Sequence, residues 1–199
     1  APPRGTARMI VLASTSATRQ AMLRNAGLEI VAVAPQVDER ELTHLHPEWA
    51  PDVTAEKLAE AKSIEVSTRT SGAIVIGADQ VLAMGPRIFN KPKDSEECRA
   101  QLRDLRGQSH ALISSVVCSR DGKVLWSKTD AAQLHMRQFS DEFLDGYLLK
   151  NGADVTTSVG GYKIESNGVQ LFSEIAGDEG SHLIQRLDGF FQIVLADRL

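Results

Sequence analysis

The sequence predicts a mixed α/β fold, in which a twisted sheet is flanked by helices around a central cleft. In the first half of the chain, short apolar runs alternate with segments of helical spacing, which is typical of strands connected by helices. In the second half, an Asp-Gly pair at 121–122 separates two strand-like runs and indicates an antiparallel hairpin. Because the chain has 199 residues and 42% of them are hydrophobic, an ordinary globular core is expected.

The N-terminal quarter of this domain is expected to contain two strands and a helix. Residues 9–13 are an apolar run, and apolar side chains then recur at helical spacing until Gly27. A second strand, 28–34, ends before Pro35. Residues 36–51 are acidic and contain prolines, so we expect a long loop there that carries part of a functional site.

A long helix and a buried strand follow. Asp52 or Thr54 can cap a helix that ends near Arg69, and Lys62 falls on the apolar stripe of that helix. Residues 73–79 form a continuous apolar run, typical of a strand buried on both faces, and this strand is expected to end on its final aspartate.

The second half should contain two more helices and an antiparallel region. Asp94 stands three residues before Glu97, which resembles a capping box. The expected elements are a helix to Arg106 that stops at Gly107, strands 110–119, 123–127 and 132–136, and a helix from Ser140 to Asn151. Glycine-rich loops and short strands should follow.

Charge and composition exclude several classes of protein. The 22 Lys and Arg residues against 26 Asp and Glu residues give a net charge of −4, so a nucleic-acid partner is not expected. No apolar run approaches the roughly 20 residues that span a bilayer, so no membrane partner is expected either. Residues 1–8 read as a flexible tail before a single domain, 9–199, and lack the apolar core of a signal peptide. With only Cys98 and Cys118, a cytoplasmic location is the simplest expectation.

One group of candidate residues surrounds the start of the first helix. Ser14, Thr15 and Ser16 lie between a strand and a helix N-terminus, where backbone N–H groups and hydroxyls can bind phosphate. Arg19, one turn into the helix, could close over that phosphate. Simple N-capping by Ser14 or Ser16 would explain the same serines. Neither a Walker A sequence nor a GxGxxG pattern is present.

A second group of candidates is charged. Asp79 follows a buried strand, at the edge of the sheet where ligands gather, although an aspartate there could also cap a turn. Lys62 must either extend to solvent or meet an anion. Glu39 could be solvated or could share a divalent cation with Asp79. Lys91, between an asparagine and a proline, could bind an anion or simply be a surface lysine.

These residues favour phosphoryl chemistry. A nucleoside triphosphate carries about four negative charges, which a divalent ion and three cationic side chains would balance. The histidines lack zinc-ligand spacing. A serine hydrolase would pair Ser14 or Ser16 with His110, but no G-x-S-x-G motif supports that alternative.

Six ordered motifs resemble one family. Residues 12–19, L-A-S-T-S-A-T-R, are similar to the opening L-A-S-x-S-P-R-R of the Maf family of nucleoside triphosphate pyrophosphatases. The other matches, in family order, are Val37-Asp38-Glu39, Leu58-Ala59 with Lys62, Gly77-Ala78-Asp79-Gln80, Lys91-Pro92 and L-R-G-Q-S-H at 105–110. The resemblance covers nearly the whole chain and implies the inosine triphosphatase-like fold.

The resemblance also implies roles for individual residues. Asp79 would be the catalytic carboxylate and, with Glu39, the ligand of Mg²⁺ or Mn²⁺. The residues that would bind the triphosphate are Ser14, Ser16, Arg19, Lys62 and Lys91. Thr18, Gln80 and Glu165 correspond to the family's base-selecting positions. A homodimer is a further implication of the family.

The residues at these three base-selecting positions do not by themselves identify the nucleotide substrate. Relatives that are selective for dTTP and UTP carry Arg, Thr and Gln at the base-selecting positions, whereas this chain has none of them. Gln80 and Glu165 look more like the 7-methyl-GTP branch, because an acid can accept the guanine N–H groups. Thr18 is not the aromatic residue that would stack on that base.

Three alternatives remain beside this interpretation. They are a dTTP- or UTP-selective pyrophosphatase, a non-catalytic nucleotide-binding regulator of cell division, and a phosphatase that removes only the γ-phosphate. The regulator is considered because the family is associated with septum formation. It would also explain why residues 177–199 lack the family's G-L-P-L motif.

Overall fold

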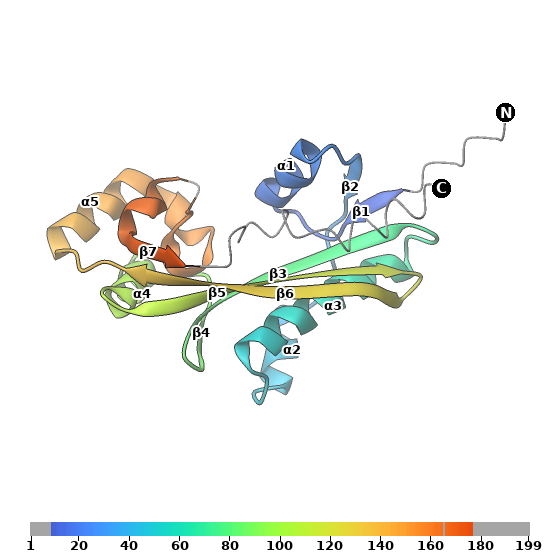
Figure 1. The fold of residues 1–199 in the computed structure, drawn as a ribbon, viewed down its shortest axis with the longest axis horizontal. Helices are drawn as coiled ribbons and strands as arrows, with labels where there is room; N and C mark the ends of the chain where they lie inside the picture. Colours follow the sequence, from blue (N-terminus) through green and yellow to red (C-terminus); the bar gives the residue numbers. More distant parts are fainter. Residues whose placement is uncertain (1–8, 165, 177–199) are drawn as a thin grey trace. The chain divides into compact units, whose positions relative to one another are not determined.

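The computed structural model describes residues 9–164 and 166–176, which fall into two compact units (Figure 1). Within the described residues, the first unit comprises 9–80 and 114–130, and the second comprises 81–113, 131–164 and 166–176. None of the helices in these ranges is long and apolar enough to cross a membrane.

The strands form one mixed sheet in the order β2-β1-β3-β5-β6-β7, and β4 pairs with β3 beside this path. Strand β1 (Ile10–Leu12) is parallel to both β2 (Ile30–Ala32) and β3 (Ile74–Met84). The remaining strands are β4 (Arg87–Phe89), β5 (Ser109–Arg120), β6 (Lys123–Met136) and β7 (Phe172–Ala176). Because β3–β4 and β6–β7 are antiparallel, the expectation of a mixed α/β fold is confirmed.

In the first unit, helices cover both faces of the parallel strands. The helices are α1 (Ala17–Asn25), α2 (Glu39–Leu45) and α3 (Pro51–Thr68). Leu23 of α1 packs in a cluster with Ile10 and Leu12, whereas Val66 of α3 packs with Val11 and other side chains from the opposite face. Since alternate residues of β1 face different helices, every position of the strand is apolar, as the sequence predicted.

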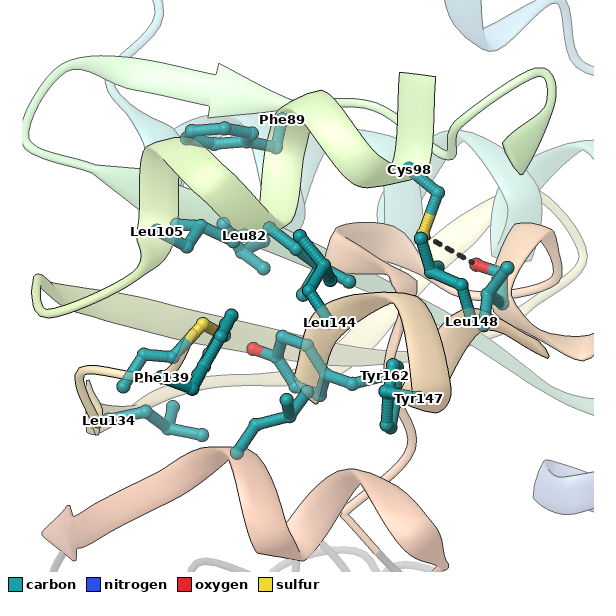
Figure 2. Packing of buried hydrophobic residues seen from close by; sticks show 14 residues of the cluster. Leu82, Phe89, Cys98, Leu105, Leu134, Phe139, Leu144, Tyr147, Leu148 and Tyr162 are labelled. Atoms are coloured by element: carbon teal, nitrogen blue, oxygen red, sulfur yellow. Dashed lines mark hydrogen bonds between the residues drawn. The ribbon is translucent and has the colours of Figure 1, made fainter. Parts of the chain in front are cut away.

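The second unit has its own apolar core. It contains α4 (Ser95–Leu105), α5 (Asp141–Asn151) and the 3₁₀ helices η1 (Gly152–Thr156), η2 (Val159–Gly161) and η3 (Asn167–Leu171). Figure 2 shows the core at close range, where Leu82 and Leu134 come from strands and Leu105 and Leu144 from helices. The aromatic ring of Tyr162 is buried in the same cluster.

Several local signals are confirmed. The side chains of Asp94 and Ser140 cap α4 and α5 by accepting hydrogen bonds from the backbone N–H groups of Glu97 and Phe143. At the hairpin, Asp121 and Gly122 both have positive φ, 49° and 76°, as a type I′ turn requires.

Residues 36–51 do not form the continuous loop that their composition suggested. They contain α2, which begins after Asp38, and the Asp38 side chain accepts a hydrogen bond from the backbone N–H of Glu41 at 2.9 Å. The prolines lie outside this helix, so they do not interrupt its two turns. Part of the expected loop is therefore a capped helix.

The start of α3 also differs from the expectation. The N-cap is Ala50, without a side-chain hydrogen bond, and Pro51 occupies the first helical position. Asp52 and Thr54 lie inside the first turn, and the Thr54 hydroxyl donates back to the Ala50 carbonyl. Proline can start the helix because its φ is already helical and its missing N–H has no partner there anyway.

Two strand boundaries were wrong. Strand β3 continues past Asp79 to Met84, because Leu82, Ala83 and Met84 pair with β4. The expected strands 123–127 and 132–136 are one strand, β6, in which the intervening polar residues continue the extended backbone.

Candidate active site

The site begins with an unusually close approach between α3 and β3. A Cβ on Gly77 would overlap the backbone carbonyl oxygen of Ala59 and the backbone of Ser63, so only glycine fits there. The Ser63 hydroxyl donates to the Val75 carbonyl at 3.0 Å and lies 2.5 Å from the Ser119 hydroxyl. These contacts hold the helix turn that carries Lys62 directly against the strand that carries Asp79.

Lys62 lies between two carboxylates. Its Nζ atom is 2.6 Å from Oδ1 of Asp79 and 3.0 Å from Oε1 of Glu39. Lys62 and Asp79 are only 6% and 7% exposed, whereas the side chain of Glu39 is half exposed. The lysine therefore meets anions instead of extending into solvent, and Asp79 is paired with a cation as a buried carboxylate requires.

Asp79 is not the last residue of its strand, but it does lie beyond the parallel part of the sheet. The pairing of β1 with β3 ends at Leu12 and Ile76, three residues before Asp79. Its carboxylate is therefore near the carboxyl edge of β1, where the loop from β1 to α1 begins. This loop is the usual location of ligand sites in α/β sheets.

That loop contains the predicted serines. The Ser16 hydroxyl caps α1 by accepting from the backbone N–H of Arg19 at 3.4 Å, and the Ser14 hydroxyl accepts from the backbone N–H of Ser16 at 3.1 Å. Ser16 therefore does cap the helix, as the alternative interpretation of these serines predicted. The N-terminus of α1 nevertheless lies next to the charged residues. Arg19 is fixed by its Nη1 atom, which donates to the Ala78 carbonyl at 2.9 Å.

The charges of this cluster are balanced. Asp79 and Glu39 are negative when ionised, and Lys62 and Arg19 are positive. Burial raises the pKa of Asp79 above its ordinary value, although Lys62 opposes this effect and Glu39 adds to it. Burial lowers the pKa of Arg19, which the neighbouring acids oppose. The raised pKa makes Asp79 a better proton acceptor than an exposed aspartate.

The structure thus brings together six predicted residues within the first unit, namely Ser14, Ser16, Arg19, Glu39, Lys62 and Asp79. Thr18 lies exposed in the first turn of α1, and Gln80 is exposed and donates to the Ser114 hydroxyl at 3.1 Å. Lys91 is an exposed residue of the second unit, and Glu165 lies outside the described residues.

The structure gives no support to a serine–histidine pair. His110 is buried, with Nε2 2.9 Å from the Tyr162 hydroxyl, and burial lowers its pKa to about 4. The Ser14 and Ser16 hydroxyls instead accept hydrogen bonds from the backbone N–H groups of Ser16 and Arg19. His110 is therefore a neutral core residue of the second unit.

Sequence reasoning missed the residues that hold this site in place. Ser63 and Ser119 carry no charge and belong to none of the matched motifs, and Gly77, although it begins the Gly77-Ala78-Asp79-Gln80 match, has no side chain to suggest a role. The one available signal was a glycine inside an otherwise continuous buried strand, which often marks a close backbone approach.

The carboxylates suit one type of metal site. Among residues 9–164 and 166–176, no group of three or more His, Cys, Asp or Glu side chains could hold an ion. Glu39 and Asp79 make a pair, and Mg²⁺ commonly binds one or two carboxylates while phosphates and water complete its coordination. The two carboxylates therefore fit a divalent cation only where phosphate and water oxygens supply its remaining ligands.

The comparison with known proteins identifies the family. The family model for Maf-like proteins matches residues 9–181. The chain belongs to this family. This Maf-like chain is 44% identical over 171 residues to the 7-methyl-GTP pyrophosphatase of Brucella abortus, covering 85% of the chain and 86% of the relative. It is 43% identical to the nucleoside triphosphate pyrophosphatase of Rhodopseudomonas palustris, covering 85% and 84%.

Solved structures give a weaker likeness to this Maf-like chain. A HAM1 protein from Coxiella burnetii has 16% sequence identity and a TM-score of 0.45, covering 65% of this chain and 73% of the other.

Proposed function

We propose that this Maf-like protein hydrolyses a nucleoside triphosphate to the monophosphate and pyrophosphate. The observation that carries the proposal is the buried Lys62–Asp79 pair, with Glu39 and Arg19, beside the N-terminus of α1. A proton-accepting carboxylate, two cations and a helix N-terminus together can bind a polyphosphate and activate water next to it. Relatives named nucleoside triphosphate pyrophosphatase support the same reaction.

In the proposed mechanism, Asp79 accepts a proton from the attacking water. The water oxygen bonds to the α-phosphorus, the bond from that phosphorus to the oxygen bridging to the β-phosphorus breaks, and pyrophosphate leaves. Because burial raises the pKa of Asp79, its carboxylate is more basic than that of an exposed aspartate. Arg19 and Lys62 stabilise the negative charge that develops on the phosphate oxygens.

Glu39 and Asp79 would hold a divalent cation, Mg²⁺ or Mn²⁺. When bound, that ion would act as a Lewis acid and draw electron density from the phosphate oxygens. Ser14, Ser16 and the N-terminus of α1 would orient the phosphates, and Lys91 would bring a further cation to them. The assignments of the first-unit residues follow the family motifs and the geometry of that unit, whereas the assignment of Lys91, a residue of the second unit, follows the family motif alone.

For the nucleotide, we propose 7-methyl-GTP as the first substrate to test. Gln80 and Glu165 offer acceptors for the guanine N–H groups, and relatives from Brucella abortus and Mesorhizobium japonicum are named 7-methyl-GTP pyrophosphatases. Thr18, Gln80 and Glu165 would select the base. The methylated guanine ring carries a positive charge that guanine lacks, and a carboxylate offsets this charge whereas a neutral amide does not. Replacing Glu165 with Gln should therefore reduce the preference for 7-methyl-GTP over GTP.

Product analysis tests the proposal. The protein is incubated with Mg²⁺ or Mn²⁺ and dTTP, UTP, CTP, GTP, ITP or 7-methyl-GTP, and the nucleotide and phosphate products are resolved. We expect monophosphate and pyrophosphate, with turnover reduced about 100-fold or more in Asp79→Asn. Asp104→Asn, which changes a partly exposed acid of the second unit, is the control.

Other products would contradict the proposal. Diphosphate with inorganic phosphate would indicate removal of the γ-phosphate alone. Nucleotide binding without turnover would favour the regulator. Unchanged turnover in Asp79→Asn would exclude Asp79 as the proton acceptor.

A further inference from the structure

We propose that the Lys62 ammonium is a built-in counter-ion that occupies the place of the divalent metal until a triphosphate binds. The metal then enters together with the nucleotide and not before it. This inference rests on the proposed function and adds an order of binding to it.

The first argument is the position of the ammonium. Nζ of Lys62 contacts one oxygen of Asp79 and one oxygen of Glu39, at 2.6 and 3.0 Å. These two side chains are the pair that would hold a divalent cation. An ion that binds both carboxylates must therefore compete with a cation that belongs to the protein itself.

The second argument is that Lys62 has little freedom to move away. It is 6% exposed, and the turn of α3 that carries it is held against β3 at Gly77 and by the Ser63 hydroxyl. A bare metal ion that displaced the ammonium would leave a buried positive charge without its partners, which is strongly unfavourable. Phosphate oxygens would give the ammonium new partners at the same moment.

The third argument is the sum of charges. Two carboxylates and two cationic side chains, Lys62 and Arg19, give a cluster with no net charge, so a bare divalent ion is not attracted to it. A nucleoside triphosphate carries about four negative charges and stays anionic with one divalent ion bound. Such a complex delivers the metal to the carboxylates and delivers anionic oxygens to Lys62 and Arg19.

The exchange involves no covalent chemistry. Lys62 stays protonated, its hydrogen bonds move from the carboxylates to phosphate oxygens, and the carboxylates become available to the metal. Lys62 can then serve both as the partner of Asp79 in the free protein and as a phosphate-binding residue in the complex.

Direct Mn²⁺ binding without nucleotide tests this proposal. Water proton relaxation and electron paramagnetic resonance titrations compare the Mn²⁺ affinity of the wild-type protein with that of Lys62→Met. This substitution removes the charge and keeps an unbranched side chain. We expect Lys62→Met to bind Mn²⁺ more than about tenfold tighter, because one neighbouring charge is removed. Lys57→Met, on the same helix but in a half-exposed pair with Glu60, should leave the affinity unchanged.

Two additions locate the effect. Lys62→Met with Asp79→Asn should lose the gained affinity, which places the Mn²⁺ at Asp79. Adding inorganic tripolyphosphate to the unchanged protein should produce protein-bound Mn²⁺ at concentrations where Mn²⁺ alone does not bind. Lys62→Gln, which keeps hydrogen-bond donors without charge, replaces Lys62→Met if the latter does not fold.

The outcomes separate this inference from the proposed function. Equal Mn²⁺ affinity in the unchanged protein and Lys62→Met would overturn the counter-ion role even if the protein hydrolyses triphosphates. Conversely, tighter Mn²⁺ binding by Lys62→Met would uphold the counter-ion role even if no nucleotide were hydrolysed, since the titration needs no turnover.

Discussion

The backbone carbonyl oxygen of Ala59 lies in the space that a Cβ on Gly77 would occupy, so α3 and β3 touch backbone to backbone one turn before Lys62. We predict that Gly77→Ala pushes the helix from the strand. Overpacking of this kind costs about 1–3 kcal/mol of stability, and it should also reduce turnover by separating Lys62 from Asp79. Urea unfolding and turnover measure the two effects.

A matched glycine gives the control for this change. Gly146 lies within α5, and a Cβ there would meet no heavy atom within 4 Å. Gly146→Ala should therefore be neutral or stabilising by roughly 0.5–1 kcal/mol. Equal free energies of unfolding for Gly77→Ala and the wild-type protein would show that the stability of the fold does not depend on the close approach of α3 and β3.

The hydroxyls of Ser63 and Ser119 form a fully buried pair that joins α3 to β5. Ser63→Ala should destabilise the protein by about 1–3 kcal/mol, because it removes a hydrogen bond to Val75 and leaves the Ser119 hydroxyl without this partner. Adding Ser119→Ala should cost little more. Denaturant unfolding of both single variants and the double variant gives the coupling energy, and simple additivity would contradict the prediction.

His110 should make stability fall as the pH is lowered from about 7 towards 4. Burial lowers its pKa from 6.5 to about 4, so the unfolded chain binds a proton first and is stabilised relative to the folded one. The complete effect is about 3 kcal/mol for one group shifted by this amount. Stability present above pH 6.5 is thus lost as the pH falls through this window.

Replacing His110 with Gln should remove this part of the pH dependence, which urea unfolding at several pH values can measure. His44→Gln, at an exposed position of α2, is the control. The raised pKa of Asp79 acts in the opposite direction, because its proton is bound more tightly in the folded state. Both variants keep Asp79, so its contribution cancels in the comparison, and an unchanged slope in His110→Gln would contradict the assignment.

Glu39 should also influence the pH dependence of catalysis. Its negative charge raises the pKa of Asp79, so Glu39→Gln should move the acidic limb of the kcat/KM profile to lower pH. Glu41→Gln, on the same helix and exposed, should leave the limb in place. A shift of the limb to higher pH in Glu39→Gln would show that Asp79 is not the group that titrates.

The sequence alone was sufficient for the α/β class, the caps of α4 and α5, and the family. Ser140, Asp94 and the Asp-Gly turn act on backbone groups within a few residues, so their effects can be read from local order. Lys62 differs from these local signals, because its place on the apolar face of α3 left two outcomes open, namely extension to solvent or contact with an anion.

Only the tertiary structure decided which anions Lys62 meets and how firmly. The Lys62–Asp79 contact spans 17 positions of the chain, and it depends on the close approach of two backbones at Gly77. Strand β3 continued past Asp79 because β4 supplied hydrogen-bond partners to its last residues, and α2 formed where composition suggested a loop. Such outcomes depend on partners distant in the sequence, whose contributions no local pattern contains.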